Sequence, residues 1–173
     1  MLVVGLVGLL AACGSGADRQ SDSPDATTAA PDTTTIAVAM TDYAYSPSRI
    51  SVPAGEPVIL QFTNKGTVEH YFVVGDTITS DNASFEQNLF SGISIEKQKQ
   101  TEGHDEEEEE REEGEEHHAN EFELPPGGRG SMTFTLPASK AGTYTIACFE
   151  TTGGETHHQM GMEGTLMVTT ADE

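Results

Sequence analysis

Basic side chains and cysteines are both scarce in this sequence, and each scarcity excludes classes of function. Eight Lys and Arg residues stand against 29 Asp and Glu residues, which gives a formal net charge of −21. Non-specific nucleic-acid binding depends on cations that neutralise phosphates, so this composition excludes it. Docking on an anionic membrane surface through charge is excluded for the same reason. The two cysteines, Cys13 and Cys148, lack CxxC spacing, which excludes thiolate zinc ribbons and thioredoxin-like redox motifs.

Hydrophobic runs long enough to cross a bilayer are missing as well. The apolar run from Leu2 to Ala12 has the length of a signal-peptide core and predicts a signal peptide over residues 1–12. Its last residues, Leu10-Ala-Ala-Cys13, resemble the lipobox of bacterial lipoproteins, although no Lys or Arg precedes the run. This resemblance implies that Cys13 is lipidated. The alternative is a short buried helix that carries a core cysteine.

The residues after Cys13 predict a tether. Residues 13–35 are small, polar and interrupted by proline, a composition that stays disordered. A flexible segment behind a lipid-modified cysteine places the following domain outside the cytoplasmic membrane, at the cell surface or on the periplasmic face. The lipid anchor is then its only contact with the membrane.

Residues 36–170 show the pattern of a single all-β domain. Short β-branched runs are separated by turns such as Pro53-Ala-Gly-Glu, and alternating apolar residues such as Met132, Phe134 and Leu136 share one face. Many short strands with frequent turns predict an antiparallel Greek-key β-sandwich. The predicted strands are Ile36–Met40, Arg49–Val52, Pro57–Thr63, Val68–Val74, Glu121–Leu124, Ser131–Leu136, Thr143–Phe149 and Thr165–Thr169.

The strand pattern breaks at residues 76–120, which we interpret as an insertion in the domain. Residues 102–118 contain 11 acidic residues and one Arg, and like charges at i, i+4 oppose a helix, so this part is expected to be solvated and mobile. A weak accessory copper site is the alternative use of its histidines, His104, His117 and His118. The apolar residues expected to anchor the rest of the insertion on the sandwich are Phe85, Leu89, Phe90, Ile93 and Ile95.

The C-terminal part of the domain carries the residues with metal chemistry. Cys148 is followed by the pair His157-His158 and by Met160 and Met162, and His70 offers a second imidazole from an earlier strand. A thiolate, two imidazoles and a thioether form a soft trigonal site with a weak axial ligand. This donor set selects copper and supports one-electron transfer.

Three stretches of the chain resemble the cupredoxins, the blue-copper fold: residues 43–58, 62–70 and 142–168. The resemblance implies one type 1 copper ion held by the family's ligands in their order along the chain, which here are His70, Cys148, His157 and Met162. Gly161-Met162-Glu-Gly-Thr-Leu resembles the family's lead into its last strand, so His157 and Met162 are preferred over the alternatives His158 and Met160. Tyr71 departs from the family, because many cupredoxins have Asn directly after the first His.

The resemblance implies a one-electron carrier, and the expected lipid anchor at Cys13 would tether it to the membrane. Redox proteins are the expected partners of a monomer, and the acidic segment favours basic ones among them. The alternative is a copper-binding or copper-delivery protein without redox turnover, and a third reading is an adaptor with an inactive site. An enzyme is not expected. The His-x-His pairs of a trinuclear copper cluster are absent from the sequence, and Cys148 is the single cysteine of the ligand loop.

Overall fold

A computed structural model describes residues 32–100 and 120–170 of the chain. In this part of the chain, strands dominate, and the single helix is the short 3-10 helix η1 (Ala138–Lys140). Among the described residues, no helix is long and apolar enough to cross a membrane. Cys13, the predicted tether up to residue 31, and the histidines His104, His117 and His118 lie outside the described residues.

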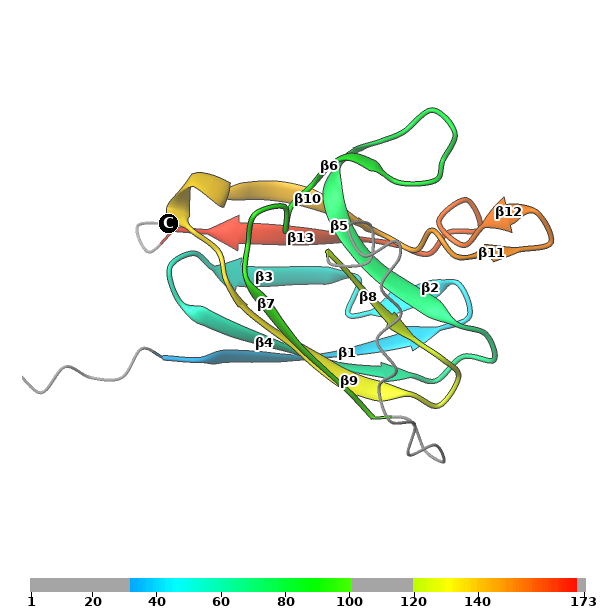
Figure 1. The fold of residues 1–173 in the computed structure, drawn as a ribbon, viewed down its shortest axis with the longest axis horizontal. Helices are drawn as coiled ribbons and strands as arrows, with labels where there is room; N and C mark the ends of the chain where they lie inside the picture. Colours follow the sequence, from blue (N-terminus) through cyan, green and yellow to red (C-terminus); the bar gives the residue numbers. More distant parts are fainter. Residues whose placement is uncertain (1–31, 101–119, 171–173) are drawn as a thin grey trace, which may run out of the picture. The chain divides into compact units, whose positions relative to one another are not determined.

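Two sheets face each other (Figure 1). The first has the order β2 (Ala44–Ser46), β1 (Thr34–Thr41), β4 (Pro57–Asn64), β9 (Arg129–Thr135) and β7 (Ile95–Gln100). The second has the order β3 (Arg49–Pro53), β13 (Glu163–Thr169), β10 (Gly142–Ala147), β5 (His70–Ile78) and β6 (Phe85–Asn88). A further strand, β8 (Glu121–Leu124), pairs with the first half of β5.

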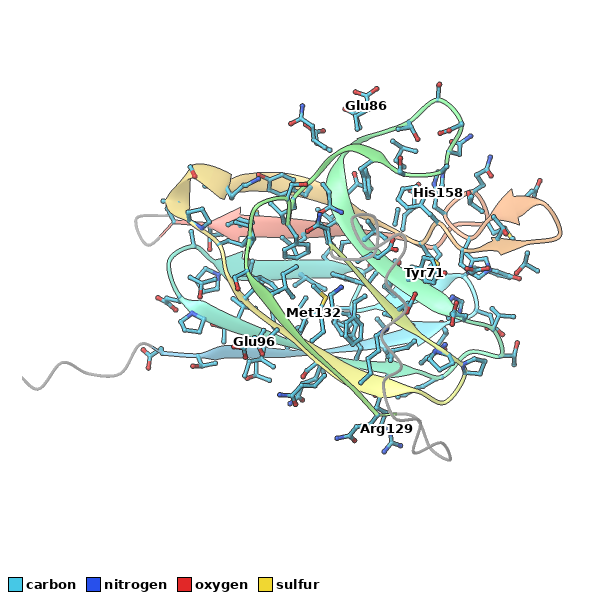
Figure 2. The ribbon with its side chains drawn as sticks, viewed as in Figure 1. Tyr71, Glu86, Glu96, Arg129, Met132 and His158 are labelled. Atoms are coloured by element: carbon cyan, nitrogen blue, oxygen red, sulfur yellow. The ribbon has the colours of Figure 1, made fainter. Side chains whose placement is uncertain are left out.

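The core lies between the sheets and is built from alternating side chains. In β4 the residues Val58, Leu60 and Phe62 are buried, whereas Gln61 between them is exposed. The Phe62 ring stacks on Phe122 of β8, with 4.6 Å between the ring centroids, so the two sheets are joined by aromatic contacts. Figure 2 shows Met132 between the sheets, whereas Glu86 and Arg129 point outward. This separation of apolar and polar faces is the one that the alternation predicts.

The expected β-sandwich is confirmed, but its strands are not all antiparallel. β1 runs parallel to β4, and β13 runs parallel to β3. Parallel neighbours cannot be joined by a tight hairpin, so in both pairs the chain passes through other strands before it returns. The prediction of a purely antiparallel sandwich is wrong in this respect.

Part of the predicted insertion belongs to the sheets themselves. β6 pairs with the second half of β5, and β7 forms the edge of the first sheet beside β9. Phe90 is fully buried and its ring meets Phe134 edge to face, with 4.9 Å between the centroids. The other expected anchors are buried or packed against a core cluster: Phe85, Leu89, Ile93 and Ile95. Residues 76–100 are therefore a structural part of the sandwich.

Candidate metal centre

The predicted metal donors lie where strands end. His70 is the first residue of β5, and Cys148 directly follows β10. These two strands are antiparallel neighbours, with Ala147 opposite Val73. Because the start of one antiparallel strand lies beside the end of the next, the sheet itself brings His70 and Cys148 together.

The loop from Cys148 to Met162 carries the remaining donors. It contains a small hairpin of β11 (Thr151–Thr152) and β12 (Glu155–Thr156), whose two-residue turn is formed by Gly153 and Gly154, both at positive φ. The backbone N–H of His157 donates to the carbonyl of Glu150 at 2.8 Å. The N–H of Met162 donates to the carbonyl of His157 at 2.9 Å. These bonds fix His157 immediately after the hairpin and Met162 immediately before β13.

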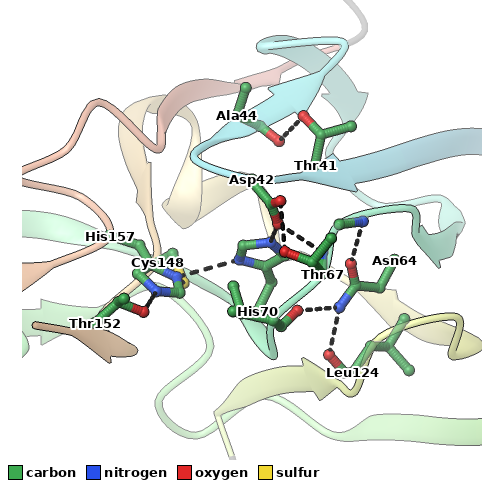
Figure 3. A network of polar contacts seen from close by, with 12 residues as sticks. Thr41, Asp42, Ala44, Asn64, Thr67, His70, Leu124, Cys148, Thr152 and His157 are labelled. Atoms are coloured by element: carbon green, nitrogen blue, oxygen red, sulfur yellow. Dashed lines mark hydrogen bonds and ion pairs between the residues drawn. The ribbon is translucent and has the colours of Figure 1, made fainter.

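Three donor atoms converge in the interior of this end of the sandwich (Figure 3). Nδ1 of His70 lies 3.2 Å from Nδ1 of His157, and the latter lies 3.4 Å from Sγ of Cys148. All three side chains are fully buried, and their donor atoms lie within 4.8 Å of one another. The structure thus places two imidazoles and one thiol around a common point.

The loop distinguishes the members of each adjacent pair. His157 is fully buried among the donors, whereas the Nδ1 of His158 pairs with Oε1 of Glu163 at 2.9 Å and its ring packs on Phe149. Met162 is fully buried, whereas Met160 is partly exposed. Burial therefore favours His157 and Met162 as the metal ligands over His158 and Met160. Figure 2 shows His158 on the side of the loop that joins β5 to β6.

Burial also sets the protonation of the donors. It raises the pKa of the Cys148 thiol to about 11, against the opposing effect of the Tyr71 N–H, which donates to Sγ at 3.2 Å. Burial lowers the pKa of His70 and of His157 below the ordinary value. Without a metal ion the site thus holds a neutral thiol and neutral imidazoles. A metal cation that binds Sγ displaces the thiol proton and leaves a thiolate ligand. Neutral imidazole nitrogens can bind the same metal ion directly, so the donor set fits a soft metal such as copper.

Tyr71 supports the site through its backbone. Its N–H, rather than a side chain, donates to Sγ of Cys148, and its carbonyl accepts from the buried Tyr45 hydroxyl at 2.5 Å. On the ligand loop, Gln159 accepts from both the N–H and the hydroxyl of Thr156. Backbone and loop contacts therefore hold the site without the Asn that many cupredoxins have after the first His.

Sequence reasoning missed several residues that support the site. Buried Asn64 donates to the carbonyls of Val68 and Leu124 and accepts from the Gly66 N–H, which fixes the loop that leads into His70. The sequence marks Asn64 as a turn residue, because Asn-Lys-Gly is a turn signal, but not as a brace. The sequence does not single out the residues that contact the outer edges of the histidines: Asp42 and Tyr43 lie in the turn after β1, and Thr152 lies on the ligand loop, five residues before His157.

Comparison with known structures supports the fold. Reduced auracyanin from the photosynthetic bacterium Roseiflexus castenholzii shares 22% identity over 79% of this chain and 97% of its own, with a TM-score of 0.51. A multicopper oxidase from Campylobacter jejuni, described as a metallo-oxidase, shares 15% identity over 80% of this chain and 30% of its own, with a TM-score of 0.50. At these identities the similarity concerns the fold alone. Among curated proteins, no sequence matches this chain.

The family itself is established by sequence. A profile of the cupredoxin-like domain matches residues 5–104, which is more than half of the 173-residue chain and includes His70. The ligand loop lies beyond this match, and there the convergence of Cys148 and His157 on His70 agrees with the fold. The chain belongs to the family of cupredoxin-like domains.

Proposed function

We propose that the protein is a type 1 copper protein that carries single electrons, with His70, Cys148 and His157 as trigonal ligands and Met162 as the weak axial ligand. The observation that carries this proposal is the convergence of two Nδ1 atoms and one Sγ within 4.8 Å in a buried site. Copper bound to such a set exchanges one electron between Cu(I) and Cu(II). His158 and Met160 take no part in the site.

Burial favours electron transfer over copper delivery. A delivery protein must pass its ion to an acceptor by ligand exchange, which requires donor atoms that an incoming ligand can reach. Here His70, Cys148, His157 and Met162 are all fully buried. Electrons can leave through bonded side chains without such access, whereas copper cannot. The same burial leaves no approach for a substrate, so we propose a protein that is not an enzyme.

The cellular setting follows from the N-terminal sequence. Lipidation at Cys13 and a tether up to residue 35 would hold a domain of residues 36–170 outside the cytoplasmic membrane, where it would meet other redox proteins as a monomer. With a net charge of −21 and acidic residues concentrated at 102–118, basic partners are the best match. Replacement of Cys13 by Ser should release the protein from the membrane fraction, and unchanged fractionation would contradict the anchor.

The absorption spectrum after copper addition tests the copper site. We expect intense visible absorption from thiolate-to-copper charge transfer, bleached by ascorbate and restored by ferricyanide. Cys148→Ala should abolish this band and keep the far-UV circular dichroism, whereas Cys13→Ser, the matched control, should keep the band. Weak d–d bands alone would favour the copper-binding alternative. No copper-dependent absorption would contradict a functional site.

A further inference from the structure

The outer nitrogen of His70, Nε2, faces the carboxylate of Asp42. Nε2 is buried, and within residues 32–100 and 120–170 it has no hydrogen-bond partner that satisfies ordinary geometry. Oδ1 of Asp42 lies 3.4 Å away, close enough for an ion pair (Figure 3). Because the inner nitrogen Nδ1 points at the other donors, the imidazole proton belongs on Nε2, where Asp42 faces it.

Asp42 is held in this position by two hydrogen bonds. Its Oδ1 accepts from the backbone N–H of Thr67 at 2.7 Å, and its Oδ2 accepts from the Thr67 hydroxyl at 2.8 Å. The side chain is partly exposed, which keeps the carboxylate charged, and its oxygens have fixed directions. Thr67 lies three residues before His70, so the loop that positions the ligand also positions the carboxylate.

Gly66 provides the space for this contact. A Cβ atom at Gly66 would lie 2.3 Å from Oδ1 of Asp42 and 2.7 Å from Nε2 of His70, closer than real Cβ contacts. The backbone of Gly66 does not have a positive φ, so conformation does not demand glycine at this position. Glycine is required at position 66 because the Asp42 carboxylate and the His70 imidazole leave no room for a Cβ atom.

We propose that Asp42 is a positioning residue of the metal site, whose carboxylate accepts the Nε2–H of His70 and keeps its Nδ1 directed at copper. The inference rests on the proposed copper site and adds a residue to it. Carboxylates in this role orient a ligating histidine and increase its basicity. His157 has a different outer partner, the neutral hydroxyl of Thr152 at 2.9 Å from its Nε2. The two histidines thus differ, because only His70 has a carboxylate, that of Asp42, next to its Nε2 among the described residues.

The charge gives the inference a measurable signature. A negative charge behind His70 stabilises Cu(II) more than Cu(I), because the oxidised ion carries the larger charge. Its removal should therefore raise the reduction potential and weaken Cu(II) binding more than Cu(I) binding. A residue that merely supports the loop would lower both affinities together and leave the potential unchanged.

The decisive variant is Asp42→Asn, which keeps the shape of the side chain. We expect Cu(II) binding to weaken about 10-fold, the lower end for outer partners of metal ligands. The ratio of Cu(I) to Cu(II) affinity should rise at least about threefold, which corresponds to about 28 mV at 59 mV per tenfold change. In the proton NMR spectrum of the Cu(I) protein, the His70 Nε2–H signal should move while that of His157 stays.

Asp76→Asn is the matched control. It removes the same charge from the exposed end of β5, six residues and about 20 Å from His70. Equal shifts of the potential in the two variants would overturn the inference. If Asp42→Asn does not fold, Gly66→Ala takes its place. This variant separates the Asp42 carboxylate from the His70 imidazole and keeps the negative charge. Unchanged Cu(II) affinity in Gly66→Ala would overturn the inference. A native protein without thiolate-to-copper absorption would instead refute the proposed function itself.

Discussion

Nδ1 of His70 lies 3.2 Å from Nδ1 of His157, although 87 positions separate the two residues in the chain. Two nitrogens at this distance can share only one hydrogen, so at least one of them presents a lone pair to the other. Because both rings are buried and both have an oxygen neighbour at Nε2, the inner nitrogens are free to turn to a common cation.

His157→Ala should damage the copper site far more than His158→Ala. Loss of a ligand should weaken Cu(II) binding beyond the roughly 100-fold upper range for outer partners of metal ligands. Loss of His158 removes its contact with exposed Glu163 and its packing on Phe149, neither of which is a donor, so the affinity should stay within about fivefold, on the order of 1 kcal/mol. Competition titration with a copper chelator measures the Cu(II) affinity of both variants. A larger effect of His158→Ala would shift the ligand assignment by one residue.

Met162→Gln should keep copper and lower its reduction potential, because the axial ligand tunes the metal more than it holds it. Met160→Gln is the control, since Met160 is partly exposed and should leave the potential unchanged. Spectroelectrochemical titration of both variants measures the potentials. If Met162→Gln loses copper as completely as Cys148→Ala, the axial role is refuted.

Phe90→Ala should destabilise the whole domain, which tests whether residues 76–100 belong to the sandwich. The side chain is fully buried and contacts Phe134, so its removal should lower the free energy of unfolding by about 3–5 kcal/mol. Glu96 on β7 is exposed, so Glu96→Ala should change the free energy of unfolding by no more than about 0.5 kcal/mol. Urea denaturation of the two variants gives these values, and similar stabilities would show that the segment is dispensable.

Neutralisation of the acidic residues at 102–118 should change partner association and leave the copper spectrum intact. Substitution by Gln is preferable to deletion, because β7 and β8 belong to different sheets and the segment must connect them. Electron transfer to a basic acceptor should depend steeply on ionic strength in the native protein and weakly in the variant. Equal salt dependence would contradict steering. A fall in stoichiometry from more than one copper to one would instead identify an accessory copper site that uses these carboxylates, and the same fall after replacement of His104, His117 and His118 would assign the histidines to it.

The eight strands predicted from the sequence all occur, and the alternation is clear in strands such as β4, which has one face in the core and one turned outward. β7 was not predicted, because in this edge strand Ile95 and Lys97 are only partly buried and the other residues are exposed, so its sequence has little apolar alternation. β6 was hidden in the same way, since Phe85 is its one buried residue. The parallel pairings of β1 and β13 depend on which strands become neighbours, and alternation carries no information on that choice.

The sequence proposes the candidate donors as a set because their chemistry is rare and their order along the chain is characteristic. Their contact partners could not be predicted, because Asp42, Asn64 and Thr152 are ordinary polar residues in a turn or at the end of a strand. What distinguishes them is tertiary: Asp42 lies 28 positions before His70 in the chain and contacts it only once β1 and β5 are folded. Spacing along the chain can indicate a ligand set, whereas the contacts on the outer side of each ligand arise only in the folded structure.

The strand-end position of the donors makes a bound metal ion a cross-link. An ion held by both His70 and Cys148 would close a ring of some 79 residues in the unfolded chain, which by the chain-entropy relation for cross-links disfavours unfolding by about 4–5 kcal/mol. Residues 101–119 lie inside this ring. Because ring entropy varies only with the logarithm of length, their removal would change it by merely about 0.2 kcal/mol. The acidic segment can therefore lengthen or shorten in evolution with almost no effect on the strength of the cross-link.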